Sequence, residues 1–131
     1  MMNQLILCDT NVLIDSFNGR TAAVEALDRI GQPNALLSVI SSIEIYRGAR
    51  NKEHLAQLRR RLRKLRVVGL TEEIGGTALD LIDEYHLSYG LDIPDALIAA
   101  TAVAYDLPLF TYNRRDFHFI AGLRLHEVSA L

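Results

Sequence analysis

The sequence predicts an α/β fold in which a central, mainly parallel sheet is flanked by helices. Short apolar segments typical of buried strands alternate along the chain with longer segments of helical periodicity. The 131 residues match the size of one domain. Because no low-complexity tract, internal repeat or Gly/Ser-rich linker divides them, we expect a single domain over residues 1–131.

The first half of the chain begins with a segment typical of a strand buried on both faces. Gln4 to Cys8 is almost wholly apolar and ends at Asp9. The pair Asn18-Gly19 is a common helix ending and separates two helical segments. The expected elements are a strand over 4–8, helices over 11–17 and 21–30, a turn over 31–34, a strand over 35–39 and a helix over 41–49.

The second half begins with an amphipathic helix, because leucines recur at three- and four-residue spacing at positions 55, 58, 62 and 65. Thr71 followed by Glu72 and Glu73 is typical of a helix start whose acids complement the helix dipole. The expected elements after the leucine-rich helix are a strand over 65–70, a helix from 71 to about 87, a buried alanine-rich helix over 94–105, and strands over 109–112 and 123–128.

The composition excludes several classes of protein. The lone cysteine, Cys8, cannot form an internal disulfide and is interpreted as a small core residue. No apolar run approaches the roughly 20 residues that a membrane helix needs, and the N-terminus lacks the basic region of a signal peptide. We therefore expect a cytoplasmic protein with no membrane partner. The four histidines have no metal-ligand spacing and are expected to be structural or exposed.

The charges are unevenly distributed although the net charge is only −2. Nine of the fourteen Lys and Arg residues lie between Arg47 and Arg66, where Glu53 is the one acid. This basic segment on an otherwise acidic chain favours a polyanion approaching one face.

Acidic residues are predicted at the places where the ends of parallel strands gather functional groups. Asp9 ends the first strand, Asp116 follows the strand over 109–112, and Asp95 opens the alanine-rich helix. Glu44 lies on a mostly apolar helix that we expect to have few exposed positions. Each acid also has a structural interpretation, namely a helix cap for Asp9, dipole complementation for Asp95, an ion pair with Arg47 for Glu44, and an ordinary turn for Asp116.

The joint placement of these acids indicates a metal site. Several carboxylates brought together repel one another unless a proton or a cation intervenes. Oxygen-only ligands select hard cations such as Mg²⁺ or Mn²⁺, which bind phosphate oxygens readily, so phosphodiester hydrolysis is the natural chemistry. Asp92, three residues before Asp95, either takes part directly or only caps the helix.

Four segments carry a resemblance to a known family, and they span nearly the whole chain. They are Asp9-Thr10-Asn11-Val12-Leu13-Ile14-Asp15, Ser42-Ile43-Glu44, residues 93–102 and residues 111–117. In order and spacing they resemble a PIN-domain ribonuclease, and in particular a VapC-type toxin of a bacterial or archaeal toxin–antitoxin pair. The departure from the family pattern is the density of arginines from Arg59 to Arg66.

This resemblance implies a PIN-like three-layer α/β/α fold and a Mg²⁺- or Mn²⁺-dependent endoribonuclease that leaves a 5′-phosphate. It implies a catalytic quartet of Asp9, Glu44, Asp95 and Asp116. In this set Asp9 and Asp95 hold one or two ions, Glu44 binds directly or through water, and Asp116 holds a water or a second ion. The implied supporting polar residues are Thr10, Asn11, Thr111 and Asn113. The implied partners are RNA, a VapB-type antitoxin and a second copy of the chain.

Other functions were weighed against the toxin. A receiver-type phosphoacceptor needs a lysine after a late strand. The only lysines, Lys52 and Lys64, lie in the middle of the chain, so this class is disfavoured. A haloacid-dehalogenase-like phosphatase needs a second aspartate two residues after the first, and position 11 is Asn. An RNA-processing PIN nuclease without an antitoxin and a non-catalytic RNA-binding PIN module stay open.

The basic segment has two interpretations. One is a solvated helix face opposite the core. The other is an electrostatic track for RNA phosphates, for which the candidate residues are Arg59, Arg60, Arg63 and Lys64. An acidic segment of the antitoxin could compete for the same surface.

Overall fold

The computed structural model describes residues 4–128, and its centre is a four-stranded sheet in the order β3-β2-β1-β4. The strands are β1 (Ile6–Cys8), β2 (Ala35–Ser38), β3 (Arg66–Val68) and β4 (Leu109–Phe110). Each neighbouring pair is parallel, with Leu7 opposite both Leu36 and Leu109. The expected central, mainly parallel sheet is confirmed.

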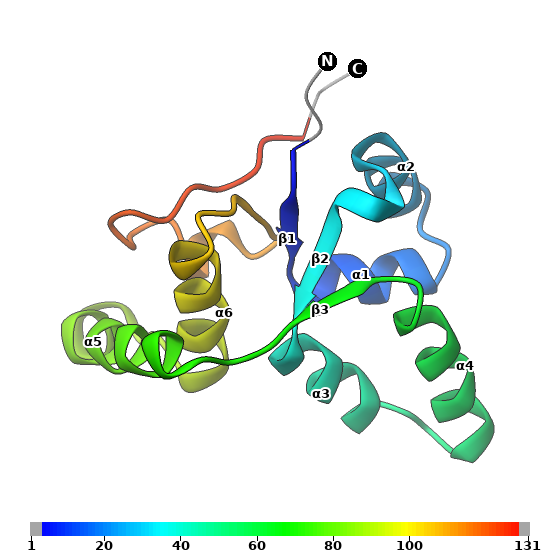
Figure 1. Ribbon diagram of the computed structural model, residues 1–131, viewed down its shortest axis with the longest axis horizontal. Helices are drawn as coiled ribbons and strands as arrows, with labels where there is room; N and C mark the ends of the chain where they lie inside the picture. Colours follow the sequence, from blue (N-terminus) through cyan, green and yellow to red (C-terminus); the bar gives the residue numbers. More distant parts are fainter. Residues whose placement is uncertain (1–3, 129–131) are drawn as a thin grey trace.

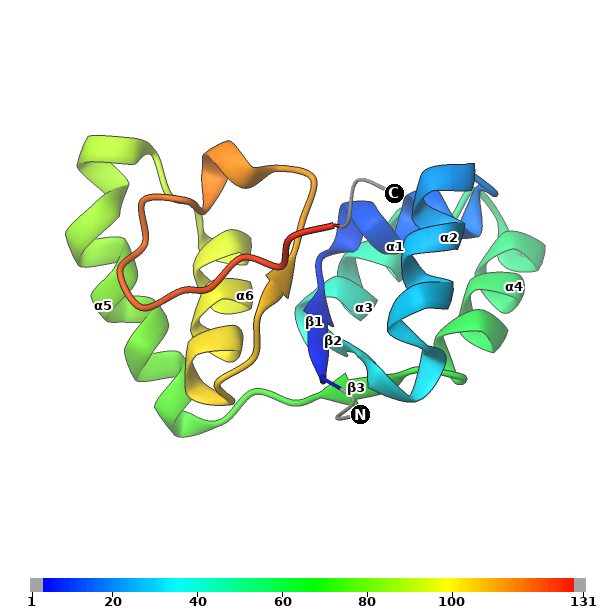
Figure 2. The same cartoon turned by 90° about the horizontal axis from the view of Figure 1, so that it is seen from above.

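Helices cover both faces of this sheet (Figure 1). The α-helices are α1 (Thr10–Phe17), α2 (Thr21–Ile30), α3 (Val39–Arg47), α4 (Lys52–Leu62), α5 (Glu72–Tyr89) and α6 (Ile93–Ala104), and the short 3-10 helices are η1 (Gln32–Asn34) and η2 (Arg114–Asp116). Viewed from above, α5 and α6 lie on one side of the strands and α1 to α4 on the other (Figure 2). The three-layer α/β/α arrangement is therefore confirmed.

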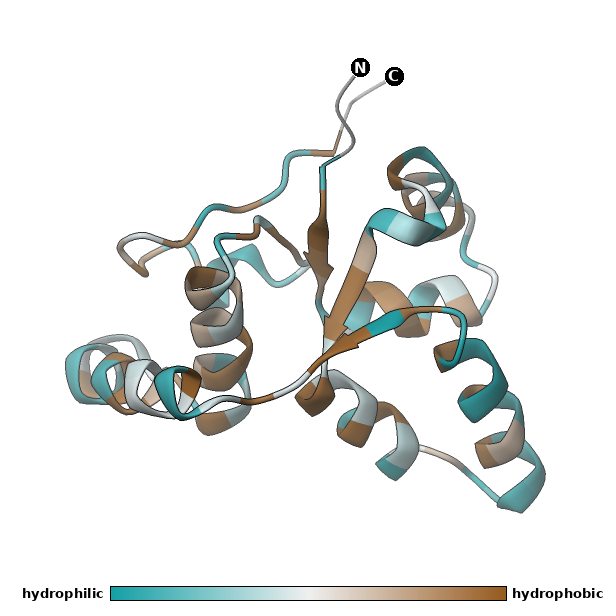
Figure 3. Ribbon diagram, viewed as in Figure 1, coloured by the Kyte–Doolittle hydropathy of each residue, from teal (hydrophilic) through white to brown (hydrophobic). Residues whose placement is uncertain are grey.

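Two apolar cores follow from the alternation of side chains along each strand. Leu7 and Leu36 pack against α5 and α6, whereas Ile6, Cys8 and Leu37 pack among α1 to α4. Figure 3 shows the apolar strands enclosed between helices that are hydrophilic on their outer sides. The alanine-rich helix α6 is buried along most of its length, as expected. Among residues 4–128, no helix combines the length and apolar character that crossing a membrane requires.

The last expected strand, over 123–128, is wrong. This segment makes a single parallel bridge, Leu125 to Leu109, with hydrogen bonds from the Leu109 amide to the Arg124 carbonyl at 2.9 Å and from the His126 amide to the Leu109 carbonyl at 2.8 Å. The physical reason is the length of the neighbouring strand. β4 ends at Phe110 and has only two residues. A strand this short offers too few backbone groups for a second strand to pair with it.

Candidate active site

Asp9 connects the end of β1 to the start of α1. Its side chain is only 4% exposed. Its Oδ1 accepts a hydrogen bond of 2.8 Å from the Thr10 amide, so Asp9 is the N-cap of α1. The capping interpretation is thus correct. It does not exclude metal binding, because a carboxylate has about four acceptor sites.

The second carboxylate oxygen of Asp9 is held from the end of β4. The Thr111 hydroxyl donates to Asp9 Oδ2 at 2.7 Å, and the same Thr111 oxygen accepts from the Asn113 amide at 3.0 Å. Asn11 adds a bridge between the two strand ends, because its Oδ1 accepts from the Tyr112 amide at 3.2 Å. Of the expected supporting groups, Thr111 and Asn11 contribute side chains here, whereas Asn113 contributes its backbone amide.

Glu44 reaches the same edge of the sheet from α3. The Thr10 hydroxyl donates to Glu44 Oε1 at 2.7 Å, and the Thr10 and Ser41 hydroxyl oxygens are 2.9 Å apart. In the part of the chain that the structure describes, Glu44 forms no ion pair with Arg47 within 4.0 Å. Thr10, an expected supporting residue, thereby joins the α1 N-terminus to α3.

Two features of α3 differ from the sequence-based expectation. The helix does expose several positions, since Ile43 is 55% exposed and Glu44 is exposed beside it. Exposure of Glu44 is therefore ordinary for this helix. Ser41, which is fully buried next to Thr10, was missed. Its position three residues before Glu44, on the same helix face, was the available signal.

Asp95 lies half-buried in the first turn of α6, and Asp92 caps that helix. The Ile93 amide donates to Asp92 Oδ1 at 2.8 Å, so the capping interpretation of Asp92 is confirmed. Burial and, after it, the negative charges of four other acids together raise the pKa of the Asp95 carboxyl to about 7. In order of effect these acids are Asp9, Asp116, Glu44 and Asp92.

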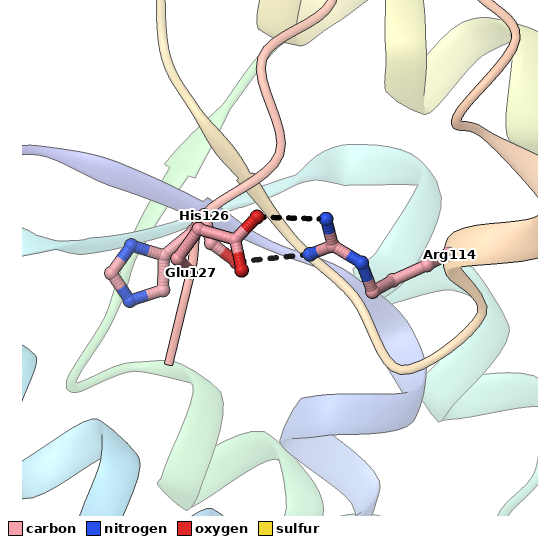
Figure 4. A network of polar contacts seen from close by, with 3 residues as sticks. All are labelled: Arg114, His126 and Glu127. Carbon is pink, nitrogen blue, oxygen red and sulfur yellow. Dashed lines mark hydrogen bonds and ion pairs between the residues drawn. The ribbon is translucent and has the colours of Figure 1, made fainter. Parts of the chain in front are cut away.

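Asp116 closes the edge from η2, where it is exposed. The short helix is tied to the C-terminal segment by Arg114, which points at the Glu127 carboxylate and at the backbone carbonyl of His126 (Figure 4). The Arg114 guanidinium donates to Glu127 Oε1 at 2.9 Å. Both side chains are largely exposed, so this pair adds at most about 1 kcal/mol to stability.

The four expected acids act on one another electrostatically. Burial raises the pKa of Asp9, hydrogen bonds from Thr111 and Thr10 oppose this, and the charges of Glu44 and Asp116 raise it further. Asp95 responds to the same neighbours. Asp9 and Asp95 therefore lie within electrostatic range of each other and of Glu44 and Asp116, at the edge of the sheet where the strands end. A proton or a cation close to Asp9 and Asp95 relieves this repulsion.

The acidic side chains suit a cation that keeps part of its water shell rather than one coordinated only by protein groups. Among residues 4–128, no three carboxylate, imidazole or thiol groups lie close enough to enclose an ion directly. Mg²⁺ keeps several of its waters and binds proteins through one or two carboxylates. Acids that interact electrostatically without direct contact are compatible with such a hydrated ion. The expected RNA-binding residues Arg59, Arg60, Arg63 and Lys64 lie away from these acids, on α4 and just after it.

Replacing Thr111 with valine is expected to lower the free energy of unfolding by about 1–3 kcal/mol at pH 7. The change keeps the shape but removes the shorter of the two hydrogen bonds to buried Asp9 Oδ2, whose other donor is the Asn11 side-chain amide at 3.4 Å, and it leaves the Asn113 amide without its acceptor. Thr101→Val is the matched control, because the Thr101 hydroxyl donates only to the Leu97 carbonyl of its own helix. Urea denaturation gives both values, and equal losses in the two variants would contradict the proposed support of Asp9.

Comparisons with known proteins agree with this architecture. The family model described as PIN domain matches residues 6–123. Ribonuclease VapC10 of Mycobacterium tuberculosis is 37% identical over 122 residues, covering 92% of this chain and 91% of that protein.

Solved structures give the same picture. A toxin-antitoxin complex from Klebsiella pneumoniae contains a chain 35% identical with a TM-score of 0.77, over 90% of this chain and 94% of that one. VapBC2 from Rickettsia felis, bound to a DNA fragment from its promoter, shares the fold with a TM-score of 0.81 at 23% identity, over 94% of this chain and 98% of that one. From the match to the family model and the level of identity, we conclude that the chain belongs to the PIN domain family.

Proposed function

We propose that the chain is a Mg²⁺- or Mn²⁺-dependent endoribonuclease and the toxin of a VapBC-type toxin–antitoxin pair. The observation that carries the proposal is the hydrogen bonding of Asp9 by Thr111 and of Glu44 by Thr10 at one sheet edge, where the charges of neighbouring acids also raise the pKa values of Asp9 and Asp95. Family membership supports nuclease chemistry for these acids. A relative named as a ribonuclease supports RNA as the substrate, and a 35% identical chain in a toxin-antitoxin complex supports the toxin role.

The proposed division of labour follows the burial of the acids. Asp9 and Asp95, the buried and half-buried members, would hold the cation directly. Glu44 would hold it through water, because no three such groups of the described residues lie close enough to bind one ion directly. Asp116 would hold a water or a second ion at the margin. When bound, the cation neutralises charge on the phosphate and lowers the pKa of water at the site.

The residues of the chain orient and accept protons in this scheme. Hydrogen bonds from the Thr10 amide and the Thr111 hydroxyl fix both oxygens of Asp9 in one orientation before RNA arrives. The Thr10 hydroxyl holds Glu44 Oε1, and the other oxygen, Oε2, accepts a proton from the water that attacks phosphorus. The bond from phosphorus to the 3′-oxygen breaks, this oxygen takes a proton from water, and the products carry a 5′-phosphate and a 3′-hydroxyl.

The proposed partners follow from the same reasoning. A VapB-type antitoxin binds the chain and restrains cleavage, the chain forms a homodimer, and both act in the cytoplasm, where the RNA substrate is. The chain spans 94% of the matched toxin-antitoxin chain from Klebsiella pneumoniae, which supports an antitoxin partner of the same class.

The test is cleavage of a panel of defined RNAs by the purified protein in Mg²⁺, in Mn²⁺ and in EDTA. We expect cleavage with either ion, none in EDTA, and products with 5′-phosphate ends that a phosphate-dependent exonuclease degrades. A parallel substrate with a 2′-deoxy sugar at the cleaved linkage should still be cut, because the 2′-hydroxyl is not the nucleophile. Equal cleavage in EDTA, or products ending in a 2′,3′-cyclic phosphate, would contradict the proposal.

A further inference from the structure

Six cationic side chains cluster on the last two turns of α4 and the segment that leads into β3. We call this cluster the α4 patch, and it comprises Arg59, Arg60, Arg61, Arg63, Lys64 and Arg66. Within the described range 4–128, none of them lies within 4.0 Å of a carboxylate. All are exposed except Arg59, which is half-buried. The patch is therefore a concentration of positive charge that the protein itself does not neutralise.

The α4 patch spans the C-terminal end of α4. Arg60 and Arg61 lie in the last turn of the helix, and Lys64 follows in a turn, where its amide donates to the Arg61 carbonyl at 3.2 Å. The large apolar residues of the helix, Leu58 and Leu62, are buried beneath it. The outer face of the patch is therefore mainly positive charge.

Two hollows flank the patch and share Arg61 and Lys64. One, of about 280 Å³, lies between α1, α2 and α4, and there the Arg61 guanidinium sits 5.2 Å from the centre of the Phe17 ring. The other is an open depression between the side chains of Gln57, Arg60, Arg61 and Lys64 at the end of α4. The concave surface beside the patch is therefore the hollow between α1, α2 and α4.

The α4 patch lies at the opposite edge of the sheet from the acids. Gln32 Nε2 donates to the Lys64 carbonyl at 2.8 Å, which ties the end of the patch to η1, just before β2 begins. η1 lies where the strands begin, whereas Asp9 lies where they end, because the sheet is parallel. The start of β2 and Asp9 are therefore about 10 Å apart along the strand direction. β3 is also two strands from β1, about another 10 Å across the sheet. A phosphate on the patch therefore cannot be the phosphate that is cleaved.

We propose that the α4 patch is a remote RNA subsite that binds backbone phosphates several nucleotides from the cleaved linkage. The inference rests on the proposed function, because it assigns the cations to the same RNA that the acids cut. A phosphate chain is attracted by a concentration of positive charge, whatever its base sequence. The RNA backbone therefore matches a surface of exposed cations.

The test measures binding without turnover. Fluorescence anisotropy follows two fluorescein-labelled probes, a uridine 30-mer and a uridine 4-mer, in EDTA over a range of salt concentrations. The variant is Arg60→Gln with Lys64→Gln, and the matched control is Arg20→Gln with Arg29→Gln, which removes two exposed charges on the α2 side. Circular dichroism verifies that both variants fold.

We expect the wild type and the control to bind the 30-mer alike, and the α4 variant to bind it on the order of tenfold more weakly. For the α4 variant, the slope of log affinity against log salt concentration should become smaller in magnitude by about 1.4, because each phosphate contact with a single strand contributes about 0.7 to this slope. The 4-mer should bind all three proteins more weakly than the 30-mer does, because it makes fewer phosphate contacts, and the α4 variant should weaken its binding as well.

Three outcomes would overturn the subsite. They are no binding of the 30-mer by the wild type, equal losses in the variant and the control, and an unchanged 30-mer affinity together with weakened binding of a labelled decaglutamate peptide, which would assign the patch to an acidic protein. This test is separable from the proposed function. If the 30-mer results hold while no RNA is cleaved in Mg²⁺ or Mn²⁺, the proposed nuclease fails and the RNA-binding surface stands.

Discussion

Replacing Asp9 with asparagine is expected to lower RNA cleavage in Mg²⁺ by about 10³-fold or more, because losing the most buried acid removes several kcal/mol of charge stabilisation. The fold should survive the change. Asparagine caps helices as well as aspartate does, so its Oδ1 can still accept from the Thr10 amide. The Thr111 hydroxyl can turn from donor to acceptor toward the new amide group. Single-turnover rates on one defined RNA, with saturating Mg²⁺, give the effect.

The matched control for this variant is Asp106→Asn. Asp106 is an exposed acid in the turn before β4, paired with Arg124 at 3.0 Å, and it has a φ of 53°, a conformation that asparagine tolerates. We expect it to cleave RNA like the wild type. A cleavage rate for Asp9→Asn within about twofold of the control would contradict a role of Asp9 as a metal ligand, because loss of a ligand should lower the rate far more than twofold.

Replacing Asp95 with asparagine is expected to abolish cleavage and yet stabilise the metal-free protein at pH 8. The Asp95 pKa of about 7 lies above the value of about 3.9 for an unfolded chain. The folded state therefore holds its proton between these two pH values while the unfolded state releases it. Stability falls as the pH rises through this window and stays low above it. Asparagine carries no charge, so the penalty disappears.

The expected gain at pH 8 is about 1–2 kcal/mol after allowance for solvent screening, or roughly 4–8 °C in Tm. At pH 4 the gain should vanish, because Asp95 is then protonated in the folded state. Thermal unfolding in EDTA at both pH values measures the difference. Asp83→Asn, an exposed acid on α5, should change the Tm at neither pH. A loss of stability for Asp95→Asn at pH 8 as large as at pH 4 would contradict the raised pKa of Asp95.

Much of the candidate site could be predicted from local patterns in the sequence. A buried apolar run that stops at an acid fixes Asp9 at the end of β1, and Thr111 follows β4 in the same way. Parallel strands bring their carboxyl ends to one edge, so residues a hundred positions apart become neighbours. The wholly apolar strands β1 and β4 also required helices on both faces, which the structure has.

Other features depend on contacts between segments, which no local pattern encodes. The segment over 123–128 has the alternation of a strand but forms only one bridge, because its partner β4 is too short. Glu44 looked suited to an ion pair with Arg47, but Thr10 from another helix holds it instead. The Arg-rich segment was visible in the sequence, whereas its position at the far edge from the acids follows from the direction of α4 relative to the sheet.

The central claim is that the acids at the strand ends share a divalent cation, and Mn²⁺ binding tests it most directly. Titration of the wild type with Mn²⁺, followed by electron paramagnetic resonance, should detect one or two bound ions per chain. Asp9→Asn and Asp95→Asn should each weaken this binding at least about tenfold, and Asp106→Asn should not. No bound Mn²⁺ in the wild type, or equal affinity in all four proteins, would contradict the account.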